Sequence, residues 1–147
     1  MNQYMKIIEE VLPPTSGEVG VQTKTGQVDA DFTITVSPRN PNSAVIKIEV
    51  ADKDFVFLHL GQATTFEIPP WGGVNLSLGQ KEQIELLVSA VIAGRFREEL
   101  VYAGDRLVGG KGTVQLPEED VSTRWSRLTA AVLKTKTTKI VKYEPYA

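Results

Sequence analysis

The sequence predicts an α+β fold, an antiparallel sheet of five to seven strands with two or three helices packed on it. Between residues 18 and 68, apolar residues alternate with polar ones in several short segments, which is typical of half-buried strands. Between residues 80 and 92, the apolar residues recur at helical spacing instead. A chain of 147 residues with 41% hydrophobic content can build its own core, so we expect one α+β domain over residues 1–147.

The first element expected is a short amphipathic helix over residues 3–12. Met5, Ile8 and Leu12 recur at spacings of three and four residues, so they share one face of a helix. The two prolines at positions 13 and 14 cannot continue a helix, and we expect them to end it.

A meander of strands is expected next, beginning with the alternating segment at residues 18–23. The clearest strand has five apolar residues on one face: Val28, Ala30, Phe32, Ile34 and Val36. Asp29 and Asp31 belong to its other face. Further strands are expected over residues 44–50, 55–60 and 64–68. The segment 55–60 is apolar on both faces, which predicts a central strand that is covered on both sides.

A longer helix is expected after this meander. Ser77 and Gln80 have the S-x-x-Q spacing of a capping box, and Gly94 is a natural helix end. The buried stripe of this helix consists of four apolar residues: Ile84, Leu87, Val88 and Val91.

A second hairpin is expected from strands at residues 99–103 and 106–116. Its return strand contains the run Gly109–Gly112, which we expect to form a bulge or a wide loop because glycine weakens a regular strand. The run does not fit a phosphate-binding loop, since Lys111 is followed by glycine and a strand-like segment and not by a helix.

The last quarter of the chain predicts a second helix from Pro117 and a final strand at residues 137–143. Four residues form the predicted apolar stripe of this helix: Val121, Trp125, Leu128 and Val132. Ten residues are expected in the core of the domain: Phe32, Ile34, Ile46, Ile48, Val56, Leu58, Leu87, Val91, Trp125 and Leu128.

Composition restricts the possible compartments and chemistry. The absence of cysteine excludes disulfides, thiolate metal sites and cysteine nucleophiles. The N-terminus carries acidic residues within its only apolar stretch and offers no cleavage site for a signal peptide. No apolar run approaches the roughly 20 residues that a membrane span needs. We therefore expect a cytoplasmic protein with no membrane association.

The formal net charge of −2 is unevenly distributed along the chain. Residues 1–120 hold 10 Lys and Arg against 17 Asp and Glu, whereas residues 121–147 hold six against one. An acidic body disfavours a nucleic-acid surface. The basic tail, which also contains aromatic residues, is expected to lie across the acidic body of the same or a neighbouring molecule. Binding of single-stranded nucleic acid by the tail is the least favoured alternative.

His59 is the only histidine, and it shares a strand face with Phe55 and Phe57. A lone histidine in an aromatic stripe predicts a packed, hydrogen-bonded core residue more than a catalyst. One histidine without cysteine gives no basis for a metal site or a catalytic triad, so we predict no metal and no cofactor.

We interpret the chain as a small non-enzymatic protein that binds another protein, as an inhibitor, an immunity-type neutraliser or an adaptor does. No set of nucleophile, base and metal ligands stands out, and an acidic body suits a basic partner. The candidate partner-binding residues are Trp71, in a loop rich in proline and glycine, and Asp29 and Asp31. A homodimer is a further possible assembly.

The alternative function is a small-ligand-binding protein or a minor enzyme. It requires a pocket between the sheet and the helices, with His59, Glu67 or Glu99 at its mouth. This alternative predicts a concave and partly polar cavity beside His59.

Overall fold

The computed structural model describes residues 3–23, 32–72, 78–127 and 135–147. Within these residues it contains two α-helices, α1 (Gln3–Val11) and α2 (Gln80–Ile92), and one 3₁₀ turn, η1 (Asp52–Asp54). The first sheet has five strands: β1 (Gly17–Thr23), β2 (Phe32–Pro38), β3 (Ile46–Val50), β4 (Val56–Leu60) and β5 (Thr64–Ile68). The second sheet has four strands: β6 (Phe96–Ala103), β7 (Arg106–Gln115), β8 (Asp120–Ser126) and β9 (Lys136–Lys142). The α+β class and the antiparallel pairing are confirmed, but the described strands form two sheets instead of one.

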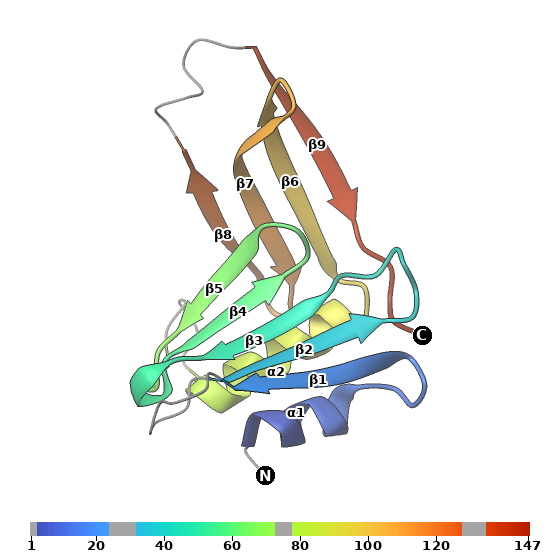
Figure 1. Cartoon of the computed structure of the whole chain (residues 1–147), viewed down its shortest axis with the longest axis vertical. Helices are drawn as coiled ribbons and strands as arrows, with labels where there is room; N and C mark the ends of the chain where they lie inside the picture. The colour runs from blue at the N-terminus through green and yellow to red at the C-terminus, as the bar shows by residue number, and fades with distance from the viewer. Residues whose placement is uncertain (1–2, 24–31, 73–77, 128–134) are drawn as a thin grey trace.

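The first sheet is an antiparallel meander with strand order β1-β2-β3-β4-β5, and α2 crosses one of its faces (Figure 1). Alternate side chains of the strands face the helices in cross-strand rows, such as Ile34, Ile48, Leu58 and Phe66. All four are at most 2% exposed. The α1 side chains in the same core are Tyr4, Ile7 and Ile8. Packing of two amphipathic helices on one apolar sheet face therefore forms the core.

The second sheet has strand order β8-β7-β6-β9, and its β6–β7 hairpin points away from the first sheet (Figure 1). Phe96, Val114 and Val121 lie at the other end of these strands and belong to the same core as the first sheet. A smaller apolar cluster, Ala103 and Val108, lies near the β6–β7 turn. The two sheets therefore share one core at the base of the hairpin.

Most of the predicted core is buried as expected. Seven of the ten residues are fully buried: Ile34, Ile46, Ile48, Val56, Leu58, Leu87 and Val91. Phe32 is half-buried at the margin of the core, and Trp125 is half-buried on the second sheet. Leu128 lies outside the described residues.

The covering of β4 differs from the prediction. β4 is an interior strand, as expected, and Val56 and Leu58 on its inner face are buried. Phe57 and His59 on the outer face are only half-buried. The rings of Phe55 and Phe57 pack together with their centroids 5.2 Å apart. The doubly apolar pattern therefore arises from an aromatic pair near the surface and not from a second covering layer.

The start of α2 also differs from the prediction. The helix begins at Gln80, Gly79 is its N-cap residue, and no side chain caps it. Ser77 lies outside the described residues. Gln80 is buried, and its side-chain amide bonds to three groups of neighbouring elements: the hydroxyl of Tyr4 and the carbonyl oxygens of Asp54 and Ile68. The predicted helix end is confirmed, because Gly94 follows the C-cap with a φ of +78°.

The glycine-rich run is part of the continuous strand β7, so the wide loop, one of the two predicted alternatives, is wrong. A register shift of the kind expected for the other alternative, a bulge, lies directly before the run: Val101 and Tyr102 of β6 pair with Gly109 and Leu107, which leaves Val108 of β7 without a partner in the register. The glycines provide space for neighbouring side chains. A Cβ on Gly112 would overlap the side chain of Thr64, and one on Gly110 would lie 3.1 Å from Nε1 of Trp125. β7 therefore needs glycine where β5 and the Trp125 indole approach its backbone.

The segment expected to form a second helix begins with the strand β8. Val121, Thr123 and Trp125 alternate with Ser122 and Arg124 along this strand. Val121 and Trp125 are four residues apart, so they fit the period of two of a strand as well as the predicted helical stripe. Antiparallel pairing with β7, in which Trp125 lies opposite Gly110, selects the strand. Val132 lies outside the described residues.

The predicted final strand is confirmed as β9, and the chain then returns to the first sheet (Figure 1). Tyr146 is 4% exposed, its hydroxyl donates to the carbonyl oxygen of Ala44 at 2.6 Å, and its N–H donates to that of Ile92. The three lysines of β9 are exposed: Lys136, Lys139 and Lys142. The end of the chain therefore contacts the first sheet through Tyr146, and Glu144 and Pro145 contact the loop between β2 and β3. In the described part of the chain, no helix is long and apolar enough to span a membrane.

Candidate functional site

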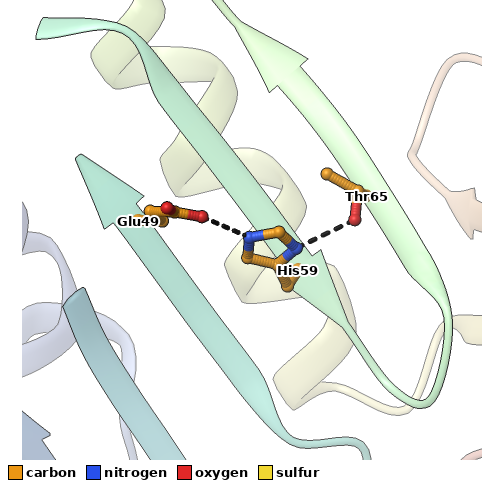
Figure 2. Close-up of polar contacts among 3 residues, drawn as sticks. All are labelled: Glu49, His59 and Thr65. Carbon is orange, nitrogen blue, oxygen red and sulfur yellow. Dashed lines mark hydrogen bonds and ion pairs between the residues drawn. The ribbon is translucent and has the colours of Figure 1, made fainter. Parts of the chain in front are cut away.

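The only histidine lies between a carboxylate and a hydroxyl on the first sheet (Figure 2). Nε2 of His59 is 2.8 Å from Oε1 of Glu49 on β3, and Nδ1 is 2.9 Å from Oγ1 of Thr65 on β5. Thr65 is directly opposite His59 in the register, whereas Glu49 is opposite Phe57 and reaches His59 diagonally. Strand alternation places all three side chains on the face that points away from the core.

A carboxylate, an imidazole and a hydroxyl in this order allow the histidine to act as a general base toward the hydroxyl. If Nε2 donates to Glu49, then Nδ1 can accept the hydroxyl proton of Thr65. The side chains of Glu49 and His59 are 40% and 34% exposed, so water reaches the network. Cross-strand pairs of this kind stabilise a sheet by about 0.2–1 kcal/mol. His59 is hydrogen-bonded, as expected, but it is a half-exposed residue of the outer face and not a core residue.

Thr65 also lines a groove between the two sheets. The groove has a volume of about 630 Å³ and lies between β5 and β8, which are both edge strands. Glu67 and Thr65 line its β5 side, and Arg124, Trp125 and Arg127 line the opposite side. The expected hollow next to His59 therefore lies between two sheets and not between a sheet and helices. The helix-covered face of the first sheet is instead filled by buried side chains.

The side of this groove opposite β5 is aromatic and basic. The guanidinium of Arg127 lies 5.9 Å from the ring centroid of Trp125, within the range of a cation–π contact. Trp125 is half-buried over Gly110, whereas Arg124 and Arg127 are exposed. The groove can thus present two cations and an indole to a bound molecule.

The three residues of the predicted ligand pocket do not form one site. Glu67 is exposed and lines the groove between the sheets, which His59 reaches only through Thr65. Glu99 lines a different hollow, of about 330 Å³, on the second sheet with Lys111. The structure therefore brings two of the three predicted residues near one another.

Trp71 is the most exposed large hydrophobic residue of the described chain, with 80% of its surface accessible. It follows β5 in a tight turn in which the N–H of Gly72 donates to the carbonyl oxygen of Pro69 at 2.9 Å. Gly72 has a φ of +83°, a conformation that favours glycine. The other two predicted partner-binding residues, Asp29 and Asp31, lie outside the described residues.

Sequence reasoning missed a buried carboxylate, Glu98, which is 1% exposed. It accepts hydrogen bonds from four donors: the N–H groups of Gln62 and Ala63 and the hydroxyls of Thr64 and Tyr143, at 2.5–2.9 Å. It therefore joins the β4–β5 turn, β6 and the C-terminal segment. The sequence does contain one indication of this burial. Residues 96, 98 and 100 lie on the same face of a strand, and an apolar Phe96 and Leu100 on either side predict that Glu98 is buried with them.

The tyrosines at the C-terminus have perturbed acidities. Burial raises the pKa of Tyr143 above its usual range, and the hydrogen bond to the Glu98 carboxylate raises this pKa further. Burial alone raises the pKa of Tyr146. Both phenols are therefore hydrogen-bond donors well into the alkaline range.

The described residues contain no cluster of three or more histidine, cysteine or acidic side chains that could hold a metal ion. Comparison with known protein families, curated proteins and solved structures gave no match for this chain.

Proposed function

We propose that this chain is a non-enzymatic protein-binding module that anchors its partner through Trp71. The exposure of this indole carries the proposal. At 80%, it exceeds that of the other exposed large hydrophobic residues among those described, which range from 38% to 59%. Tryptophan is the side chain most enriched at the energetic centres of protein interfaces, because it buries a large area with few rotatable bonds.

The turn that carries Trp71 is constrained by its own sequence and by one backbone hydrogen bond. Pro69 and Pro70 fix two successive φ angles, and the bond from Gly72 to Pro69 closes the turn. A pre-organised anchor loses little conformational entropy on binding, which favours affinity. The turn directly follows β5, so the partner surface we propose extends from Trp71 along this edge strand.

Charge supports a basic partner. The sequence from residue 1 to residue 92, within which α1, α2, the first sheet and Trp71 lie, contains 11 Asp and Glu against six Lys and Arg. Such a surface accelerates the encounter with a positively charged partner and adds specificity.

The test is native mass spectrometry of the tagged full chain isolated from the cells in which it occurs. We expect a stoichiometric second polypeptide on the wild type and its loss from Trp71→Ala, since truncating a hot-spot tryptophan costs about 2 kcal/mol or more, or about 30-fold in affinity. Ile140→Ala is the matched control, because Ile140 is 59% exposed on the second sheet. A partner retained equally by Trp71→Ala and Ile140→Ala would contradict the proposal.

The groove beside Thr65 supports a second candidate, a small-ligand-binding protein. Its volume of about 630 Å³ is within the range of ligand sites, and Trp125 with two arginines could bind an anionic molecule. The same spectra distinguish this candidate. It predicts a small-molecule mass that is lost from Trp125→Ala and retained by Trp71→Ala.

A further inference from the structure

A small hollow at the base of the second sheet is lined by three basic side chains. It lies where β6 begins after α2 and where β9 ends, and its volume is about 200 Å³. Six residues line it: Gly94, Arg95, Phe96, Arg97, Gln115 and Lys142. The hollow thus carries three positive charges and no negative one, although the formal net charge of the whole chain is −2.

In the part of the chain that the structure describes, no acidic side chain neutralises these cations. The one ion pair among these residues joins His59 and Glu49 on the first sheet. Glu144 follows Lys142 by two residues, but its carboxylate accepts from the side-chain amide of Asn40 at 3.4 Å. Within these residues, the three cations of the hollow therefore have no counter-ion.

Two acidic residues share this face of the second sheet, but neither lines the hollow. Glu99 follows Arg97 on the same face of β6, where it lies opposite Lys111 and lines the separate hollow of about 330 Å³. Asp120 is on the edge strand β8, opposite Gln115. The negative charge of this face therefore lies outside the hollow.

Two of the basic residues repel each other across the sheet. Arg97 on β6 and Lys142 on β9 are directly opposite in the register. The N–H of Tyr143 donates to the carbonyl oxygen of Phe96 at 3.2 Å, which makes these two residues a hydrogen-bonded pair. Such pairs alternate in an antiparallel ladder, so Arg97 and Lys142 form a non-hydrogen-bonded pair, in which the side chains are closest. Like charges directly opposite destabilise a sheet, and an anion between them would remove this cost.

The end of α2 does not explain the cations. Basic side chains near the C-terminus of a helix often bond to its last carbonyl groups, which have no partner within the helix. In α2 these carbonyl oxygens accept from backbone N–H groups instead: Ser89 from Ala93, Ala90 from Arg95, Val91 from Gly94 and Ile92 from Tyr146. The basic side chains of the hollow are therefore not needed to satisfy the helix.

We infer that this hollow binds a phosphate group, either of inorganic phosphate or of a small phosphate ester. A phosphate group at neutral pH carries a charge of about −1.5 to −2 and several strong acceptor oxygens. The planar guanidinium groups of Arg95 and Arg97 can each bind two of these oxygens, and Lys142 adds a point charge. A volume of about 200 Å³ is below the roughly 300–1,000 Å³ of sites for drug-sized ligands, so it suits a single small group.

Isothermal titration calorimetry of the full chain with inorganic phosphate tests the site, with sodium chloride at matched ionic strength as the reference. We expect one phosphate per chain and about 10-fold weaker binding by Lys142→Gln, because a charge-assisted hydrogen bond is lost. Lys139→Gln is the matched control, since it makes the same change on the same strand but on the opposite face of the sheet. No binding by the wild type, or an equal loss in the two variants, would overturn the inference.

The same titration with glycerol phosphate distinguishes the two sources of the phosphate group. Binding of both compounds identifies a site for phosphate esters, and binding of inorganic phosphate alone identifies a site for the free ion. Either result supports the hollow as a phosphate site. Trp71→Ala should bind phosphate as the wild type does, because Trp71 follows β5 in the first sheet and the inference does not rest on its partner.

Thermal unfolding tests the repulsion between Arg97 and Lys142 independently of the titration. In chloride, Lys142→Gln should unfold at a higher midpoint than Lys139→Gln, because it alone relieves the like-charge pair. Phosphate also stabilises proteins by exclusion from their surface, so the wild type and the variants are compared in the same phosphate buffer. At about five times the dissociation constant, phosphate should raise the midpoint of the wild type by about 2–3 °C more than that of Lys142→Gln. An equal rise in both proteins would contradict the site.

Discussion

Glu98 is a single buried residue on which three parts of the chain depend. Oε1 of its carboxylate accepts from the N–H of Gln62 and the hydroxyl of Tyr143, and Oε2 accepts from the N–H of Ala63 and the hydroxyl of Thr64. Two of the donors are backbone N–H groups that point into the protein, where an unpaired donor is costly. We conclude that this carboxylate fixes the turn next to Thr65 and therefore the edge of the groove.

Glu98→Ala should lower the free energy of unfolding by about 3 kcal/mol or more, because it leaves several buried donors without an acceptor. Urea denaturation followed by circular dichroism measures this change. Glu99→Ala is the control on the opposite face of β6, where the residue is half-buried, and it should change stability by about 0.5 kcal/mol or less. Equal effects of the two substitutions would contradict the structural role of Glu98.

At the scale of elements, the sequence predicted strands and helices best where one period was unambiguous. The first five strands and α2 follow alternating or helical patterns over segments whose other positions are polar. β8 was mistaken for a helix because Val121 and Trp125 fit both a period of two and a period of four. Its pairing with β7 decided between them, and that pairing depends on glycines distant in the sequence.

Gly112→Ala should destabilise the protein by about 1–3 kcal/mol, because the new methyl group would overlap the Thr64 side chain. A double-mutant cycle with Thr64→Ala isolates the steric contribution. The second substitution removes the overlap as well as a hydrogen bond to Glu98, so it should cost less in the Gly112→Ala background than in the wild type. Additive unfolding free energies would show that the close approach of β5 to β7 is not what requires glycine.

At the scale of the whole molecule, the last residues hold the two sheets together. Tyr143 bonds to Glu98 and stacks on Phe96 with the ring centroids 5.2 Å apart. Tyr146 inserts into the core beside α2 and donates to Ala44 in the first sheet. The C-terminal segment therefore connects the two sheets through its tyrosines. The sequence predicted instead that the basic residues of this segment would contact the acidic body.

Stability should fall at alkaline pH for the same reason. Burial raises the pKa of Tyr143 and Tyr146 in the folded state, so the folded chain holds these protons more tightly than the unfolded chain, in which tyrosine titrates near pH 10. The contribution of these two protonated phenols to the free energy of unfolding is complete below about pH 10 and is lost as the pH rises beyond it. Urea unfolding at about pH 8 and about pH 11 should show a smaller loss for the double variant Tyr143→Phe and Tyr146→Phe than for the wild type. An equal loss in both proteins would refute this explanation.

Periodicity and turn residues are local properties of the chain, and they were enough to predict the fold class, the meander of the first sheet, α2 and most of the core. Tertiary structure decided the division into two sheets, the strand β8, the burial of Glu98 and the groove between β5 and β8. Each of these depends on which distant segments become neighbours, as Thr64 and Gly112 do, and a periodic pattern contains no record of its partner. The predicted role of Trp71 depends on both, since the sequence identified the residue and the fold left it exposed.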